Sequence, residues 1–194
     1  MNRFQLMLKM AKNCVKTGEF TLNSGAKSNV YFDKYQVMTN ADMFNSAIEQ
    51  MANLLFSNDD AYLKQFIAPE LGGAMLATAL QQYMYTKYRS SVELNIVRSE
   101  SKDHGIGDVV LGRLSQTTTA VIVDDVITSG KAILDTISKV HHQNPNIRIA
   151  QIIALVDRGG EGVKMLRDKK YNVSTVFTFD EITQADMRPD LHNW

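Results

Sequence analysis

Apolar runs and polar, glycine-bearing segments alternate along the chain after residue 60, and this pattern predicts a parallel β-sheet covered by helices. Short apolar runs typical of buried strands are expected at residues 66–68, 92–97, 120–124, 148–156 and 173–179. Apolar residues recur at helical spacing before and between these runs, at 41–56, 74–88, 133–140 and 162–169. A repeated succession of strand, loop, helix and strand is typical of an α/β fold with helices on both faces of the sheet.

The N-terminal segment, residues 1–16, is expected to be an amphipathic helix. The residues expected on its apolar face are Phe4, Met7, Leu8 and Ala11. Lys9 and Lys12 interrupt any apolar stretch there, so the segment lacks the apolar core of a signal peptide. The longest apolar runs, 120–123 and 152–156, are far shorter than the roughly 20 residues that span a bilayer. We therefore expect neither an export signal nor contact with a membrane.

The composition fits a single domain, 1–194, with a sizeable core, since 44% of the residues are hydrophobic and 22% are charged. Lys and Arg together number 21, as do Asp and Glu, so the net charge is zero. A protein that coats nucleic acid would carry a basic excess, and we therefore expect no nucleic-acid partner. Cys14 is the one cysteine of the sequence, which excludes an internal disulfide and a cysteine-rich zinc site. A reducing compartment, the cytoplasm, is the expected location.

The loops that follow the expected strands are the places to look for a ligand site, because ligands of parallel sheets bind at the carboxyl ends of the strands. Four such loops begin at Pro69, Arg98, Asp124 and Asp157, and all are polar or glycine-rich. The loop from Arg98 to residue 111 has few apolar anchors, and we expect it to be mobile.

Residues 120–132, AVIVDDVITSGKA, carry the clearest chemistry. Asp124 and Asp125 are expected to end a buried strand, followed by a tight turn over 126–130 and a helix that starts near Lys131. The hydroxyls of this turn, its backbone N–H groups and the helix N-terminus together suit a phosphate. Two carboxylates would repel that phosphate, but they suit sugar hydroxyls, bound directly or through a hydrated magnesium ion. The alternative is that the acids merely cap the helix and that the Thr-Ser-Gly sequence is only a turn.

Cationic residues gather in two of the other loops. Arg98, Lys102 and His104 lie on one polar loop, where they could neutralise a leaving diphosphate. Arg158 ends another expected strand and could hold a planar carboxylate by a forked contact. Each of these residues taken singly is more often an ordinary surface or turn residue, and it is their occurrence together with the phosphate-binding loop that favours a function.

The string 120–132 resembles the signature of type I phosphoribosyltransferases that binds phosphoribosyl pyrophosphate (PRPP). Three further segments resemble the orotate phosphoribosyltransferases of that family: 18–28 with 31–33, which is similar to the strands of an N-terminal hood; 97–105, the catalytic loop; and 156–162, whose arginine meets orotate. Residues 69–73 also match a pyrophosphate loop found in part of the family, and all the segments occur in the family's order along the chain. The resemblance implies a small hood, contributed mainly by about residues 1–40 together with the end of the chain, beside the central sheet.

The resemblance also implies roles for individual residues. The expected PRPP-binding residues are Gly72, Arg98, Lys102, His104, Asp124, Asp125, Val126, Ile127, Thr128, Ser129, Gly130, Lys131 and Ala132. Those expected to frame orotate are Tyr31, Phe32, Thr128 and Arg158. Lys102, Asp124 and Asp125 are the expected catalytic residues. Magnesium is expected as a cofactor held mainly through PRPP, without a direct protein ligand unless the two aspartates reach it through water. The resemblance further implies a homodimer whose catalytic loop reaches the neighbouring site.

Two residues depart from the family pattern. Lysines that face PRPP in the family are replaced here by Asn23 and Ser99, although Lys27 and Lys34 lie nearby in sequence. Three functions remain open at this point: orotate phosphoribosyl transfer, transfer to another base, and a PRPP-binding regulatory role without turnover.

Overall fold

The structure, a computed structural model, describes residues 1–21, 27–56, 63–99, 109–115 and 119–186. Its centre is a six-stranded sheet with the order β5-β4-β3-β6-β7-β8. The strands are β3 (Leu63–Pro69), β4 (Glu93–Val97), β5 (Val110–Leu111), β6 (Thr119–Ile127), β7 (Arg148–Asp157) and β8 (Val173–Thr178). Neighbouring strands pair in parallel, except that β5 runs antiparallel to β4. The expected α/β fold with a central, mostly parallel sheet is therefore confirmed.

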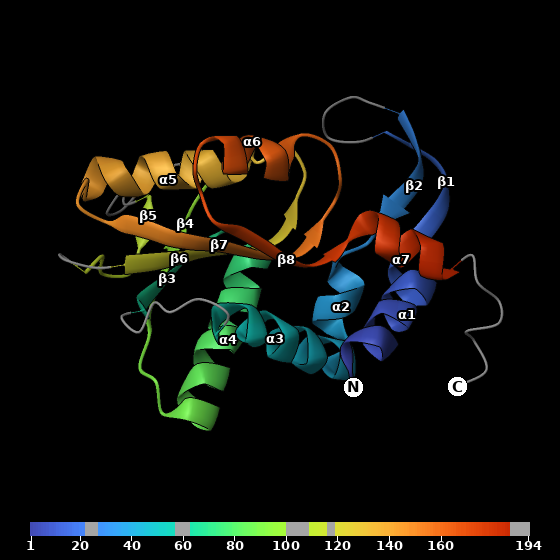
Figure 1. The fold of residues 1–194 in the computed structure, drawn as a ribbon, viewed down its shortest axis with the longest axis horizontal. Coiled ribbons are helices and arrows are strands. Elements are labelled where there is room, and N and C mark those ends of the chain that lie inside the picture. The colour runs from blue at the N-terminus through green and yellow to red at the C-terminus, as the bar shows by residue number, and fades with distance from the viewer. Residues whose placement is uncertain (22–26, 57–62, 100–108, 116–118, 187–194) are drawn as a thin grey trace.

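Helices cover both faces of this sheet. Figure 1 shows α5 (Lys131–Gln143) and α6 (Gly162–Asp168) on one face, and α3 (Ala41–Phe56) and α4 (Gly72–Tyr88) on the other. Strand β6 serves both sides, because successive side chains of a strand point to opposite faces. Val121 and Val123 belong to the core beneath α3 and α4, whereas Ala120 and Ile122 belong to the core beneath α5 and α6. Burial on both faces explains why this strand is a continuous Val/Ile-rich run.

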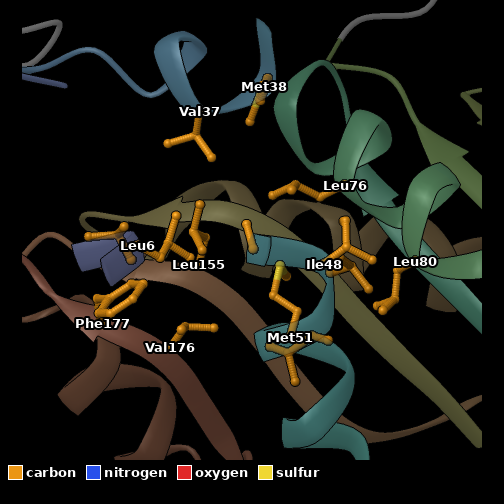
Figure 2. Packing of buried hydrophobic residues seen from close by; sticks show 14 of the residues in the cluster. Leu6, Val37, Met38, Ile48, Met51, Leu76, Leu80, Leu155, Val176 and Phe177 are labelled. Carbon is orange, nitrogen blue, oxygen red and sulfur yellow. The ribbon is translucent and has the colours of Figure 1, made fainter. Parts of the chain in front are cut away.

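The larger core joins the sheet to the N-terminal part of the chain. Figure 2 shows Leu6, Val37, Ile48, Leu76 and Phe177 converging in it, from segments that lie far apart in the sequence. The N-terminal elements are α1 (Arg3–Cys14), β1 (Val15–Thr21), β2 (Lys27–Phe32) and α2 (Tyr35–Thr39). Strands β1 and β2 form a separate two-stranded antiparallel sheet, which is the expected hood.

The last described helix, α7 (Phe179–Asp186), lies beside α1 (Figure 1). Arg3 connects α1 to α7 and β8, since its guanidinium pairs with Glu181 at 2.9 Å and donates to the carbonyl of Val176. Within the described part of the chain, none of the helices is both long and apolar enough to cross a bilayer.

The structure corrects three local expectations. The N-terminal helix is present, but it buries Leu6, Met10, Ala11 and Cys14, whereas Phe4 is 44% exposed. Of the expected face, Ala11 is buried and Met7 and Leu8 are partly buried, so the buried face is shifted rather than replaced. Packing against α3 and α7 selected this part of a wide apolar side of the helix. Burial also raises the pKa of the Cys14 thiol to about 12, which keeps it protonated and unreactive.

The second correction is that strand β6 does not end at Asp124. It continues through Val126 and Ile127, which pair with Val156 and Asp157 of β7. β-Branched residues favour an extended backbone, and Ile127 is fully buried.

The third correction is that the short strand β5 lies inside the stretch 98–111, which the sequence analysis expected to be a loop throughout. Val110 is buried there, and its backbone pairs with Val97 at the edge of the sheet.

Candidate functional site

The candidate site lies where the carboxyl ends of β3 and β6 meet. From this pair the chain proceeds outward in opposite directions, to β4 on one side and to β7 on the other. The helices that follow the two strands, α4 and α5, cover opposite faces of the sheet (Figure 1). Such a point in a parallel sheet leaves a crevice between the two loops, and ligands of α/β proteins bind there. Residues 69–73 and 124–130 follow the two strands at this point, and they define the candidate site.

Asp124 and Asp125 lie near the carboxyl end of β6 and are almost buried, with 7% and 3% exposure. Each carboxylate accepts a hydrogen bond from the next backbone N–H, at 2.8 Å for Asp124 Oδ1 and 2.6 Å for Asp125 Oδ1. The ammonium of Lys34, at the start of α2, lies 2.7 Å from Asp125 Oδ2. Both acids are therefore held in place by the backbone, and one of them is neutralised by a cation from the hood side of the molecule.

The first turn of α4 approaches these two acids closely because it begins with two glycines. A Cβ on Gly72 would lie 1.6 Å from Asp125 Oδ2, and one on Gly73 would lie 3.3 Å from Asp124 Oδ1. The absence of side chains at both positions lets the carboxylates reach the N-terminus of this helix, where negative charge is favourable. Gly72, one of the expected PRPP residues, thus touches the acid pair.

The two carboxylates differ in their electrostatic environment. Burial, with the charge of Asp125 adding to it, raises the pKa of Asp124 from 3.8 to about 7. Burial disfavours the charge of Lys34, but attraction to Asp125 outweighs it, and the pKa of the Lys34 ammonium lies above its ordinary value. Asp124 therefore titrates near neutral pH, beside a carboxylate that is paired with the Lys34 ammonium.

This difference predicts how stability depends on pH. Between 3.8 and about 7 the folded protein keeps a proton on Asp124 that the unfolded chain has lost, so its free energy of unfolding falls as pH rises through this window. Asp124→Asn removes the effect, and we expect it to stabilise the protein more at pH 8.5 than at pH 5.5. Urea unfolding of both proteins at the two pH values measures the difference. A gap that stays constant or narrows with pH would contradict the raised pKa.

The loop that follows the acids is held by both backbone contacts and close packing. Arg158 N–H donates to the carbonyl of Ile127 at 2.9 Å. A Cβ on Gly162 would lie only 2.2 Å from the carbonyl oxygen of Thr128, and Gly130 has a φ of +71° that favours glycine. Thr128 and Ser129 are exposed on this loop, directly before α5. Lys131 and Ala132 are exposed on the first turn of that helix, whereas Ile127 and Gly130, also expected to bind the phosphate, are buried.

Arg158 connects the end of β7 to the hood and to α7. Its guanidinium lies 3.6 Å from the ring centroid of Phe179 and donates to the carbonyl of Val30 at 3.2 Å. Burial lowers the pKa of this guanidinium from its ordinary value. Phe32 packs edge to face on the same Phe179 ring and is buried, whereas Tyr31, which neighbours Phe20, is 40% exposed. The structure thus brings Arg158 and Phe32 together around Phe179 and places Tyr31 on the surface of the hood.

A further group of contacts fixes the start of the expected catalytic loop. Glu70 accepts hydrogen bonds from the backbone N–H and the hydroxyl of Ser99, at 2.9 and 2.7 Å. Lys139 of α5 donates to the carbonyls of Arg98 and Ser99, at 3.0 and 2.8 Å. The two hydrogen bonds from Ser99 lower the pKa of the Glu70 carboxyl, which therefore stays ionised at neutral pH. Lys102, His104 and Asn23 lie outside the described residues.

Sequence reasoning missed several of these contributors. Lys34 was noticed only as a nearby lysine, and nothing in the sequence connects it with Asp125. Lys139 lies in a helix and pairs with Asp135 one turn away, which is the pattern of an ordinary surface residue. Glu70 lies in the segment 69–73, which the resemblance singled out, but its contact with Ser99 has no local signal. Gly162 likewise belongs to a noted segment, without any indication that it contacts Thr128.

Comparison with known proteins agrees with this geometry. The family model described as "Phosphoribosyl transferase domain" matches residues 38–185. An orotate phosphoribosyltransferase of Archaeoglobus fulgidus is 34% identical over 148 residues, which are 76% of this chain and 77% of that protein. The crystal structure of orotate phosphoribosyltransferase from Aeropyrum pernix is 25% identical, with a TM-score of 0.76, and the match covers 91% of this chain and 94% of that one. The Mycobacterium tuberculosis orotate phosphoribosyltransferase in complex with PRPP shares the fold at 18% identity, with a TM-score of 0.71 and coverage of 93% and 98%.

Proposed function

The chain belongs to the phosphoribosyltransferase family, and from that membership we propose that it is an orotate phosphoribosyltransferase. The reaction transfers the 5-phosphoribosyl group of PRPP to orotate, which gives orotidine 5′-phosphate and pyrophosphate. The observation that carries the proposal is the pair of buried carboxylates at the junction of β3 and β6, directly before an exposed Thr-Ser-Gly loop at the start of α5. Relatives with the same activity in sequence and in structure support the choice of orotate as the base.

The geometry suggests how the chain would perform this reaction. A nitrogen of orotate forms a bond to C1 of the ribose while the bond from C1 to the pyrophosphate oxygen breaks, and the proton of that nitrogen passes to solvent or to the leaving pyrophosphate. No protein nucleophile is therefore needed. Asp124 and Asp125 accept the ribose hydroxyls and support the positive charge that develops on the sugar. The loop from Thr128 to Gly130 and the N-terminus of α5 bind the 5′-phosphate. Arg158, beneath the hood, lies where it can hold the carboxylate of orotate. Catalysis then comes from positioning and from charge stabilisation.

Magnesium fits this site as a partner of PRPP. Among the described residues there is no group of three or more His, Cys, Asp and Glu side chains that could hold a metal ion. The two carboxylates supply hard oxygen donors of the kind magnesium prefers, and they would reach the ion through water. When bound, magnesium would neutralise negative charge on the leaving pyrophosphate. Arg98, with Lys102 and His104 outside the described residues, completes the expected pyrophosphate-binding set.

One assay tests the proposed function and its two competitors. The decrease of orotate absorbance is followed with PRPP and magnesium, and the assay is repeated with uracil and with purine bases, whose products are separated chromatographically. We expect turnover with orotate. Asn23, in place of a family lysine, favours the competitor that uses another base, and turnover with such a base alone would establish it. PRPP binding by calorimetry without turnover of any base would indicate a regulatory protein.

We also propose a homodimer in which the loop containing Lys102 serves the neighbouring site. Lys102→Ala and the double variant Asp124→Asn/Asp125→Asn are each expected to be nearly inactive. Mixing them under conditions that exchange subunits should restore part of the activity, because some sites then combine an intact loop with an intact acid pair. No recovery, with exchange verified by mass spectrometry of tagged subunits, would exclude a shared site.

The contact between Ser99 and Glu70 sharpens the question of the missing lysines. Ser99→Lys should increase kcat/KM for PRPP by less than about tenfold. A full charge-assisted contact, about 1.5–3 kcal/mol, would increase it by roughly tenfold to a hundredfold. The reason is that the ionised Glu70 carboxylate, now bonded to Ser99, would pair with the new ammonium. The control is Ser99→Lys/Glu70→Gln, in which the ammonium is free and the gain should be larger. If neither variant exceeds the wild type, the missing lysine does not limit the reaction.

A further inference from the structure

Lys34 occupies an unusual position between the hood and the acid pair. It directly precedes α2, and its ammonium lies 2.7 Å from Asp125 Oδ2. The carboxylate is 4% exposed, whereas the lysine side chain is 34% exposed. The ammonium also lies 5.6 Å from the ring centroid of Tyr35. The lysine thus reaches a buried acid from a position that solvent can enter.

A purely structural role explains this arrangement poorly. The cost of desolvating a buried ion pair often cancels its attraction, so such a pair is weak support for stability. Asp125 is moreover expected to accept a ribose hydroxyl, and the ammonium beside Oδ2 would have to yield part of this contact when the sugar binds. The flexible four-carbon stem of lysine allows the ammonium to move by several ångströms without a change of the backbone.

The charge balance of the site indicates where the ammonium would go. The ligand brings several negative charges to a site that already contains two buried carboxylates, and such charges repel strongly where water is scarce. Two other cations have other partners, since Lys139 donates to two backbone carbonyls and Arg158, which donates to Val30, is assigned to the carboxylate of orotate. Lys34 is paired with the very group that the sugar would engage, so sugar binding would release its charge beside the ligand.

We propose that Lys34 is a PRPP-binding residue that neutralises Asp125 in the free protein and pairs with the diphosphate of PRPP once the ribose hydroxyls engage Asp125. The inference rests on the proposed function and extends it. It adds Lys34, at the start of α2, to the PRPP-binding residues expected from the family signature at 120–132. It also gives the N-terminal part of the molecule a direct role in binding the leaving group.

Three variants test the proposal, with Lys16 as the matched control. Lys16 makes an ion pair of the same length, 2.7 Å, with Asp33, but its side chain is half exposed and the pair does not involve the acids of the site. Lys34→Met removes the charge and keeps the unbranched stem, Lys34→Arg keeps the charge, and Lys16→Met removes the control charge. The dissociation constants of PRPP and of ribose 5-phosphate are measured by calorimetry with magnesium, at two salt concentrations, and thermal melting verifies folding.

We expect Lys34→Met to weaken PRPP binding by about tenfold to a hundredfold, with a smaller dependence on salt, because one charge-assisted contact is lost. The dissociation constants of ribose 5-phosphate, which lacks the diphosphate, should agree within about threefold between the wild type and Lys34→Met. Lys34→Arg and Lys16→Met should both bind PRPP nearly as the wild type does. Unchanged or tighter PRPP binding by Lys34→Met, or an equal loss for ribose 5-phosphate, would overturn the inference. If Lys34→Met does not fold, Lys34→Gln takes its place with the same expectations. A wild-type protein that binds no PRPP would overturn the proposed function itself. If the wild type binds PRPP, the Lys34 variants test the role of Lys34 alone.

Discussion

Asp124→Asn/Asp125→Asn should lower kcat/KM for PRPP by about 10²- to 10⁴-fold while the protein remains folded. Each carboxylate is expected to accept a ribose hydroxyl, and a hydrogen bond to a charged group contributes about 1.5–3 kcal/mol, so two of them account for this range. Both carboxylates are buried, but the fold should tolerate the replacement of each by an amide. Asparagine keeps the shape and an oxygen that can accept the bond from the next backbone N–H, as the carboxylates do now.

Steady-state kinetics and a thermal melt of the double variant decide this prediction. The single variants separate the two acids, because Asp125→Asn also leaves the Lys34 ammonium without its partner and should lower the free energy of unfolding, whereas Asp124→Asn should not. A folded double variant with near wild-type kcat/KM would refute the assignment of the acid pair to the ligand.

Gly72→Ala should lower kcat/KM for PRPP by about tenfold to a hundredfold, although it adds only one methyl group. The new Cβ would lie 1.6 Å from Asp125 Oδ2 and 2.6 Å from its Cγ, so the carboxylate must move away from its present position. Alanine normally favours a helix over glycine by about 1 kcal/mol, so helix propensity does not predict a loss. The loss arises because a catalytic group is displaced, and misplacement of about 1 Å can cost a hundredfold in rate.

Gly160→Ala is the matched control for this substitution. Gly160 has a φ of +88°, and among the described residues nothing lies within 4 Å of the position of a Cβ there. The control should lose about 1–2 kcal/mol of stability through backbone strain and keep its kcat/KM. Equal losses of kcat/KM in the two variants, or full activity of Gly72→Ala, would show that the contact between Gly72 and Asp125 does not position the carboxylate.

The main sheet and the loop proposed to bind phosphate were predictable because their signals are local. Residues 120–132 combine a Val/Ile run, two acids and a Thr-Ser-Gly sequence within thirteen positions, and the structure places a helix start at Lys131 as expected. Local patterns were less reliable where one segment satisfies several geometries. The wide apolar side of α1 allowed different buried faces. The acids after the Val/Ile run suggested the end of a strand, but the strand continues, since Val126 pairs with Val156.

The sequence by itself determined the order of the longer strands and helices of the main sheet, the class of fold and the chemical character of each loop, because periodicity and turn chemistry depend on neighbouring residues. Only the tertiary structure decided which of these residues meet. Lys34 reaches Asp125 across 91 positions of sequence, and Glu70 reaches Ser99 across 29. Gly72 touches the acid pair because β3 and β6 are adjacent in the sheet although two strands intervene between them in the chain. Such contacts depend on the path of the whole chain, and a single sequence carries no local trace of them.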